Sequence, residues 1–401
     1  MSFSYSAFIK HWNLDKTVCF LNHGSFGATP IEILKKQQDL LYRMEEEPVR
    51  FMVREAEERW DDSRRIASSF VGGVPENFVF VRNATAGVNV VLNSLSLGIQ
   101  DEVLITNHTY GACVNTLKEL AETRGFSIRV VELKLPIESE DQILSLLEDA
   151  TTSKTKLLLI DHITSPTAIV FPIEKIVKQF EEKGIEVLVD GAHGPGMIDL
   201  KLEQLGASYY VGNFHKWVCA PKGVAFLYVR QDRKKKIKPL QKSHYYLNSD
   251  NENFWANQFF WPGTDDFTSA FLSPESIRFM ENLFEGGWPA IREHNNTLTL
   301  LGKNILEQKF FGKAPVPSTM LGSMAIAYLG EFDFPTLNFN KPNPLQNKLF
   351  FDYNIEVPIV NFPSGSPHYY VRISAQVYNH ISQYEYLANA LQEAVLSFQK
   401  G

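Results

Sequence analysis

A lysine, a carboxylate and a histidine near the middle of the chain could together do chemistry on a carbonyl compound. Lys216 lies in the segment 213–217, Asn-Phe-His-Lys-Trp, and is followed by apolar residues that would partly desolvate its amine. Desolvation lowers the pKa of a lysine and favours the neutral amine, which attacks an aldehyde to form a Schiff base. Asp190 and His193 lie in the segment 190–194, whose glycines let the backbone approach a ligand closely. A lone lysine is most often a surface residue, so the combination carries the prediction.

Pyridoxal phosphate (PLP) has the aldehyde, the pyridine ring and the phosphate that such residues would bind. Asp190 is placed to keep the pyridine nitrogen protonated, so that the ring acts as an electron sink. Residues 84–87, Ala-Thr-Ala-Gly, form a turn of small residues at the expected start of a helix, where backbone N–H groups and the Thr85 hydroxyl can bind a phosphate. Capping of that helix by Thr85 is an alternative, and it is compatible with phosphate binding.

These residues follow segments that we expect to be strands of one sheet. Between residues 78 and 229, short apolar and β-branched runs alternate with helical stretches, which is typical of a largely parallel sheet covered by helices. The runs are 78–81, 102–106, 127–133, 156–161, 185–190, 209–212 and 224–229. In an open α/β sheet, ligands bind at the carboxyl ends of the strands. Asp190 and Lys216 both lie at such ends.

The 401 residues are expected to form two domains of an α/β protein. Helices over residues 30–70, interrupted at Pro48, precede the sheet. After about residue 270 we expect helices over 273–284 and 289–310, strands over 324–329, 355–360 and 369–374, and a closing helix. The interpretation is a large domain over 16–268 with a mostly parallel seven-stranded sheet, and a small α+β domain over 269–401, on which residues 1–15 could pack.

Composition and charge exclude several classes of protein. The formal net charge is −7 and the basic run 233–236 is isolated, so we expect a solvated turn there and no nucleic-acid partner. No apolar run approaches the length that spans a bilayer, and the N-terminus has no signal-peptide pattern. Cys19, Cys113 and Cys219 form no CxxC pair, which argues against disulfides and zinc and favours a cytoplasmic location.

Five motifs together resemble the class V aminotransferase superfamily. They are 20–30 (FLNHGSFGATP), 82–85 (RNAT), 190–193 (DGAH), 213–217 (NFHKW) and 371–374 (VRIS), in order along nearly the whole chain. The combination of Asp-x-x-His with the later His-Lys is specific, and the group that the chain resembles most is the isopenicillin N epimerase-like proteins. The resemblance implies a PLP enzyme of fold type I that acts on an amino acid, and a homodimer whose active sites lie at the subunit boundary.

The resemblance also assigns roles around the cofactor. Lys216 would hold PLP as a Schiff base and move protons at Cα of the substrate. Asp190 would pair with the pyridinium nitrogen, and His193 would lie near the phenolic oxygen. The residues implied around the phosphate are Thr85, Ala86, Asn213 and His215, together with Gly263 and Thr264 from the second subunit.

Other assignments concern the substrate and the face of the ring. Arg372 would bind the substrate carboxylate through paired hydrogen bonds. Asn22 and His23, in the Asn-His-Gly-Ser turn, are placed near the substrate entrance. Many relatives have adjacent histidines where this chain has Asn-His-Thr-Tyr-Gly at 107–111, so we favour Tyr110 over His108 as the residue that stacks on the ring. Core packing is the alternative for Tyr110.

The sequence leaves the reaction open. Epimerisation at Cα is the first hypothesis, and it needs a second acid/base opposite Lys216, for which Tyr110 and His23 are the candidates. The second is β-elimination by a carbon–sulfur lyase that acts on a cysteine conjugate or sulfoxide, which needs only Lys216 and a good leaving group. Cysteine desulfuration would need a thiol ahead of Arg372, and no cysteine follows Cys219. Transamination stays open.

Two alternatives come from other classes of protein. A metal hydrolase could use Asp190, His193 and His215, but the chain has no HxH or HExxH element there. A non-catalytic binding protein is the other. The substrate side chain is not identified, and the aromatic segment 243–260 could contact either the substrate or a second subunit.

Overall fold

The computed structural model describes residues 3–247, 254–310, 312, 314–334 and 342–399, and its centre is a seven-stranded sheet. The strands, in spatial order, are β2 (Phe78–Val81), β8 (Ala225–Val229), β7 (Tyr209–Asn213), β6 (Glu186–Asp190), β5 (Thr155–Asp161), β3 (Glu102–Thr106) and β4 (Ser127–Val131). The five strands from β7 to β4 are mutually parallel, whereas β8 runs antiparallel to both of its neighbours. The expected mostly parallel sheet is confirmed.

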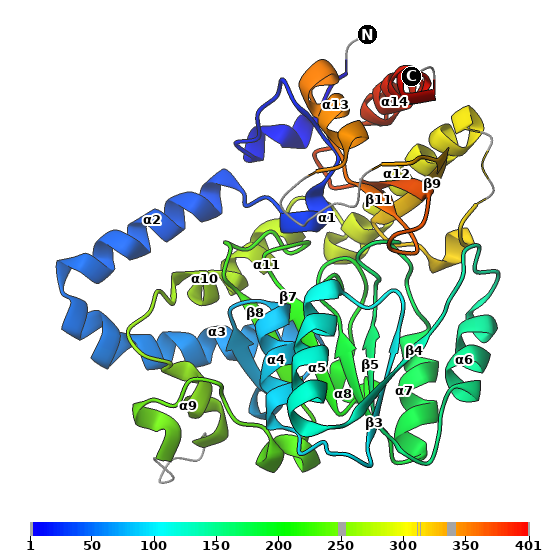
Figure 1. The fold of residues 1–401 in the computed structure, drawn as a ribbon. Helices are drawn as coiled ribbons and strands as arrows, with labels where there is room; N and C mark the ends of the chain where they lie inside the picture. The colour runs from blue at the N-terminus through cyan, green and yellow to red at the C-terminus, as the bar shows by residue number, and fades with distance from the viewer. Residues whose placement is uncertain (1–2, 248–253, 311, 313, 335–341, 400–401) are drawn as a thin grey trace.

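Helices cover this sheet (Figure 1). They are α4 (Ala84–Ser94), α5 (Gly111–Arg124), α6 (Glu140–Asp149), α7 (Ile173–Glu182) and α8 (Leu202–Leu205). Helix α7 buries Ile173, Ile176, Val177 and Phe180, whose helical spacing puts them on one face. Helix α4 lies so close to β7 that a Cβ on Gly87 would be 2.7 Å from a Val211 methyl group. Glycine therefore lets the start of α4 reach the edge of the sheet.

A smaller antiparallel sheet lies beyond the large one. It contains β11 (Ile359–Asn361), β12 (His368–Ser374) and β9 (Met324–Glu331), with β12 in the middle. Its helices are α12 (Gly287–Phe310), α13 (Pro344–Tyr353) and α14 (Ile381–Gln399). Strand β1 (Cys19–Phe20) pairs in parallel with β10 (Ile355–Glu356), and the Ser6 N–H donates to the Tyr378 carbonyl. The N-terminal segment thus packs on the C-terminal part of the chain.

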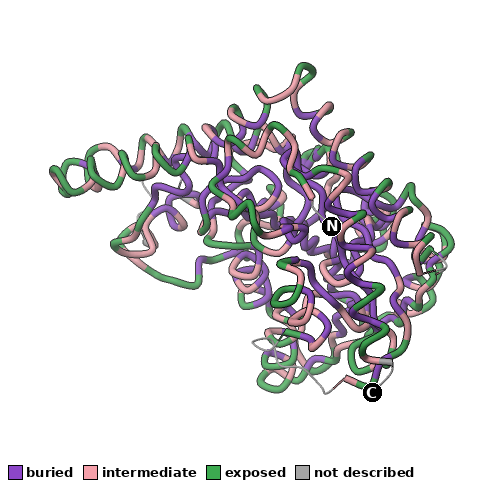
Figure 2. The backbone as a smooth tube through the Cα atoms, turned by 90° about the horizontal axis from the view of Figure 1, so that it is seen from above, coloured by how far each residue is buried: buried purple, intermediate pink, exposed green. Residues whose placement is uncertain are grey.

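Two consecutive helical segments extend from the body of the protein. They are α2 (Ile31–Glu46) and, after a short π-helix at Arg50–Glu55, α3 (Ala56–Phe70), so the expected interruption at Pro48 is observed. Helix α2 extends away from the large sheet (Figure 1), and much of the backbone that protrudes in Figure 2 is exposed or intermediate. Helix α2 buries only Ile33 of its 16 residues and exposes Leu34, Leu41 and Tyr42. The remaining helices are α1 (His23–Phe26), α9 (Phe254–Phe260), α10 (Thr268–Phe271) and α11 (Ser273–Glu281). The domain boundary near residue 268 stays a prediction. At that position Gln37 of α2 donates to Thr268, so a helix of the N-terminal part contacts the chain where the boundary is expected.

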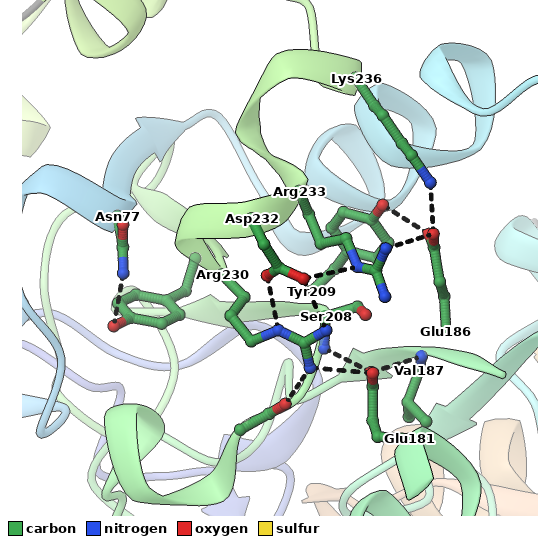
Figure 3. Close-up of polar contacts among 12 residues, drawn as sticks. Asn77, Glu181, Glu186, Val187, Ser208, Tyr209, Arg230, Asp232, Arg233 and Lys236 are labelled. Atoms are coloured by element: carbon green, nitrogen blue, oxygen red, sulfur yellow. Dashed lines mark hydrogen bonds and ion pairs between the residues drawn. The ribbon is translucent and has the colours of Figure 1, made fainter. Parts of the chain in front are cut away.

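The basic run 233–236 lies in a short 3-10 helix, Gln231–Lys236, that is tied to the sheet (Figure 3). Arg233 and Lys236 both pair with Glu186 at the start of β6, and the Arg233 contact is 3.2 Å. Arg230 pairs with Glu181 at 2.8 Å and with Asp232 at 2.7 Å. The expected solvated turn is therefore only partly observed, because two of the four basic residues tie the short helix after β8 to the start of β6. None of the helices that the structure describes is long and apolar enough to cross a membrane.

Candidate active site

Strands β6 and β7 bring the three central residues together. Their parallel pairing aligns Asp190, the last residue of β6, with Val211 of β7, and the chain continues from β7 to Lys216. The Lys216 Nζ lies 3.0 Å from the His193 Nε2, and the Trp217 Nε1 lies 3.3 Å from the His193 Nδ1. Because an indole N–H can only donate, Nδ1 must accept, and the neutral imidazole carries its hydrogen on Nε2. His193 then donates to the Lys216 amine, which can accept only when it is neutral.

The electrostatics of Lys216 agree with this tautomer. Desolvation, reinforced by the positive charge of Arg372, lowers the pKa of Lys216 to about 7, although Asp190 and Asp161 act in the opposite direction. Part of the Lys216 side chain keeps contact with solvent, so a ligand can reach it. Burial and the Lys216 charge hold the pKa of His193 well below its ordinary value. Near pH 7 the site therefore presents a neutral imidazole and an amine that is about half neutral.

A pair of buried carboxyl groups lies behind the amine. Asp190 accepts from the Ala192 N–H at 3.0 Å and is contacted by the Cys113 thiol at 3.6 Å. Asp161, at the end of β5, is the register partner of Asp190 and is 2% exposed. Burial raises the pKa of both carboxyl groups, and the charge of Asp190 raises that of Asp161 further. Of the two carboxyl groups, Asp161 therefore keeps a proton more readily, and Asp190 is the better source of the negative charge.

The start of α4 is the part of the site that is predicted to bind the phosphate. Asn83 caps the helix by accepting from the Ala86 N–H at 2.8 Å, and the Asn213 side chain accepts from the Ala84 N–H at 2.9 Å. The expectation that Thr85 is the cap is wrong, because Asn83 occupies that position. The Thr85 hydroxyl has no hydrogen-bond partner among the residues that the structure describes, so it is available to an anion.

His215 and the segment 263–264 are the other residues predicted around the phosphate. His215 contacts the Val224 carbonyl through Nδ1 at 3.1 Å. Gly263 and Thr264 line a cavity of about 530 Å³ that Ala86 also lines but that Lys216 does not reach. Their contribution to the site of a second subunit stays a prediction. The cavity contains many aromatic side chains: Trp60, Phe80, Phe259, Phe260 and Phe267.

Arg372, on β12, is a buried cation without an anionic partner among the described residues. It is 5% exposed, and its Nη2 donates to the Ser25 hydroxyl at 2.8 Å and to the Asn22 Oδ1 at 3.4 Å. Its Nη1 donates to Ser165, and its Nε has no partner in the described part of the chain. Burial lowers the pKa of Arg372 to about 10. Since a buried guanidinium with only neutral acceptors is poorly compensated, the arrangement fits a carboxylate ligand.

The loop before α5 contains both candidates for ring stacking, and their environments differ. His108 is fully buried, and its nitrogens lie 2.7 Å from the Thr167 hydroxyl and 2.9 Å from the Leu133 carbonyl. Tyr110 is half-buried at the N-terminus of α5. Burial raises the pKa of Tyr110, to which the charge of Asp190 adds, while Arg372 has the opposite effect. The geometry therefore favours Tyr110, although its role stays a prediction.

His23 does not lie where the sequence suggested. It is 1% exposed, its Nδ1 is 2.7 Å from the Tyr378 hydroxyl, and its Nε2 is 3.0 Å from the Lys216 carbonyl. Burial lowers the pKa of His23 to about 3. The expectation of a residue at the substrate entrance that acts as an acid/base opposite Lys216 is wrong, because both ring nitrogens are engaged behind the lysine backbone.

The residues present fit PLP. A neutral amine, a buried carboxylate, a free hydroxyl at a helix N-terminus and an uncompensated arginine match the aldehyde, the pyridine nitrogen, the phosphate and a substrate carboxylate in turn. The metal-hydrolase alternative has no support, since no group of three or more potential ligands lies together within the described ranges.

Comparison with known proteins identifies the family. The model of the class V aminotransferases matches residues 21–314, which is well over half of the chain. The chain belongs to the class V aminotransferase family, and its fold is that of the fold type I PLP enzymes. A variant of C-DES with glycine covalently linked to its PLP cofactor has a similar structure, with a TM-score of 0.76 at 19% identity over 93% of this chain and 96% of C-DES.

Relatives within the family have more than one activity. A probable chloroplastic L-cysteine desulfhydrase of Arabidopsis thaliana is 30% identical, and the match covers 92% of this chain and 82% of the relative. Isopenicillin N epimerase of Streptomyces clavuligerus is 28% identical over 94% and 95% of the two chains. Hercynylcysteine sulfoxide lyase of Schizosaccharomyces pombe is 25% identical over 96% of each. Family membership alone therefore leaves both the lyase and the epimerase hypotheses open.

The structure adds residues that the sequence did not single out. Ser25 and Ser165 bind Arg372, Cys113 contacts Asp190, and Asp161 is the second carboxyl group. Asp161 ends an apolar strand as Asp190 does, so the same signal could have revealed it. The two serines and the cysteine carry no such signal, because their contacts join distant parts of the chain.

Proposed function

We propose that this protein is a PLP-dependent carbon–sulfur lyase that acts by β-elimination on L-cysteine or an S-substituted cysteine. The supporting observation is that Lys216 is the one group of the described site that is poised to take a proton at Cα. His23, one of the two candidates for an opposing acid/base, is engaged behind the lysine, and the other, Tyr110, has a raised pKa that disfavours its action as a base. Elimination needs one base and a leaving group, whereas inversion needs acid/base groups on both faces.

The chain supplies binding and proton movement for this reaction. Arg372 binds the substrate carboxylate, and Asp190 holds a proton at the pyridine nitrogen of the cofactor. Bound PLP supplies the electron sink that accepts the electron pair left when the Cα proton departs. Lys216 takes that proton, the Cβ–S bond breaks, and the protonated Lys216 can return the proton to the leaving sulfur. With L-cysteine and one water, the products are pyruvate, ammonia and hydrogen sulfide.

Further assignments are part of this proposal. Thr85 and Ala86 bind the phosphate at the start of α4, and Tyr110 stacks on the ring. The free and buried Cys19, Cys113 and Cys219 support a reducing, cytoplasmic setting. The names of two relatives, the L-cysteine desulfhydrase and the hercynylcysteine sulfoxide lyase, support sulfur chemistry.

We also propose a homodimer with shared sites. The exposed apolar residues Leu34, Leu41 and Tyr42 on the protruding α2 favour contact with a second copy. The cavity that Gly263 and Thr264 line opens close to the phosphate turn, because Ala86 belongs to both. Light scattering of the purified protein would show twice the chain mass, and a monomer at micromolar concentration would contradict the proposal.

Epimerisation at Cα is the second candidate. The observation that favours it is the Tyr110 phenol, whose pKa is raised by burial and by the charge of Asp190 against the opposing effect of Arg372, so that it stays protonated and able to donate. Transamination is a weaker alternative with no specific observation in its favour.

The test is proton NMR in deuterated water of the PLP-loaded protein with L-cysteine, S-alkyl cysteines and their sulfoxides. The lyase proposal predicts pyruvate and a sulfur product. Inversion at Cα with the carbon skeleton intact and no pyruvate would instead establish epimerisation, and the lyase proposal would be wrong.

A further inference from the structure

The N-terminal turn 22–27 packs directly against the backbone of Lys216. A Cβ added to Gly27 would lie 2.0 Å from the His215 carbonyl oxygen and 3.0 Å from the Lys216 Cα. Gly27 also has a φ of +69°, in the region that favours glycine. Both constraints require glycine at this position, so the turn is built to touch the chain at the lysine.

Two donors hold the carbonyl of Lys216. The Cys219 N–H lies 3.0 Å from it, in a turn that Cys219 closes with a φ of +59°. The His23 Nε2 also lies 3.0 Å from it, and because a carbonyl can only accept, Nε2 carries the hydrogen. The Nδ1 of His23 then accepts from the Tyr378 hydroxyl at 2.7 Å. Gln376 fills the remaining space, with its Nε2 at 3.3 Å from the His23 Nε2 and at 3.6 Å from the Cys219 sulfur.

We propose that His23 is a positioning residue for Lys216, held in place by Tyr378 of the C-terminal part of the chain. The inference rests on the proposed role of Lys216 as the residue that holds PLP. With its carbonyl bound twice and its Cα against Gly27, Lys216 keeps only its side chain free. The amine therefore stays against His193 instead of moving toward solvent.

The effect of losing this anchor can be predicted from the groups around the amine. Lys216 is faced by Asp190, Asp161, Arg372 and His193, and burial is the largest cause of its lowered pKa. A backbone shift that exposes the amine reduces desolvation, so the pKa of Lys216 rises toward its ordinary value. The amine attacks the PLP aldehyde only when neutral, so uptake of PLP by the apoprotein then needs a higher pH.

A matched set of variants separates positioning from packing. His23→Asn keeps an acceptor near the Tyr378 hydroxyl but leaves nothing at the Nε2 position, whereas His23→Gln reaches that position and can donate to Lys216. Tyr378→Phe removes the hydroxyl that orients the ring. Tyr384→Phe is its control, since Tyr384 is also fully buried and its hydroxyl donates to the Ser374 carbonyl at 2.8 Å instead of to the His23 ring.

The measurement is the rate of PLP uptake by each apoprotein from pH 6 to 10, followed by the visible absorbance, together with the melting temperature of the apoprotein and kcat. For His23→Asn we expect the half-maximal uptake to move up by about one pH unit and kcat to fall about tenfold, because misplaced reacting groups cost up to about a hundredfold. His23→Gln should keep both the pH of half-maximal uptake and kcat close to the wild-type values. Tyr378→Phe should shift the pH of uptake and kcat in the same direction as His23→Asn, but by less. Tyr384→Phe should lower only the melting temperature.

The inference is overturned if His23→Asn and His23→Gln lower the melting temperature while the pH of half-maximal uptake and kcat stay at the wild-type values. It is also overturned if Tyr384→Phe shifts uptake as much as Tyr378→Phe does. A wild-type protein that takes up PLP but forms no pyruvate from cysteine substrates would count against the proposed function only, because the uptake comparison would still test His23.

Discussion

Replacing Lys216 by methionine should stabilise the apoprotein, and the gain should depend on pH. The pKa of Lys216 is lowered to about 7 in the folded protein, mainly by desolvation, whereas an unfolded lysine titrates near about 10.4. Between these values the folded state holds the amine neutral and the unfolded chain holds it protonated. The unfolded state then binds more protons, so the stability of the wild type rises with pH across this window. Below pH 7 the wild type bears the full free-energy cost of burying the lysine amine.

The quantity to test is how this stabilisation by K216M changes with pH. The free energy of unfolding of K216M minus that of the wild type should shrink by about 1.4 kcal/mol for each pH unit between pH 8 and pH 10. The total change over this window is smaller than the full pKa shift implies, because solvent contact of the Lys216 side chain screens part of the effect. Titrating groups that do not interact with Lys216 are common to the two proteins and cancel in the difference.

The assay is urea unfolding of the two apoproteins at pH 7, 8, 9 and 10, followed by tryptophan fluorescence. A difference that is independent of pH, or that grows as the pH rises, would show that the amine is protonated in the folded apoprotein at neutral pH. The assignment of Lys216 as a neutral nucleophile would then be refuted.

Three further substitutions test the site. Arg372→Lys removes one of the two hydrogen bonds that the guanidinium can donate to the substrate carboxylate, and each is worth about 1.5–3 kcal/mol. The KM for the amino acid should therefore rise about tenfold to a hundredfold. An unchanged KM would exclude Arg372 as the carboxylate-binding residue. Asp190→Asn should weaken PLP binding about tenfold or more in a titration of the visible band, and wild-type affinity would argue against pairing with the pyridine nitrogen. Tyr110→Phe should retain PLP binding and pyruvate formation, while Tyr110→Ala should lose about 0.5–1.5 kcal/mol of PLP binding; loss of turnover in Tyr110→Phe would instead indicate that the phenol moves a proton.

Much of the large sheet could be predicted from the sequence, because its strands are buried on both faces. The apolar runs 78–81 and 102–106 coincide with β2 and β3, and Asp190 and Lys216 lie at carboxyl ends as expected. The antiparallel direction of β8 could not be predicted, since strand direction depends on connections that periodicity does not describe. The strand-end signal identified the residues that meet at the edge of the sheet.

The site residues that could not be predicted depend on long-range contacts. His23 was expected at the substrate entrance because it lies in a glycine-containing turn, but its partners Lys216 and Tyr378 are remote in sequence and enclose it. Ser165 comes to Arg372 only when the loop after β5 meets β12. The choice of Asn83 over Thr85 as the helix cap was a local competition, and both residue types favour that position.

The central claim is that Lys216 holds PLP. It is tested most directly by incubating the purified protein and its K216A variant with PLP, recording the visible spectrum, and reducing the mixtures with borohydride for peptide mass spectrometry. The account predicts a visible band for the wild type alone and a reduced pyridoxyl adduct on Lys216. No uptake of PLP, or an adduct on another lysine such as Lys222 with the band retained in K216A, would contradict it.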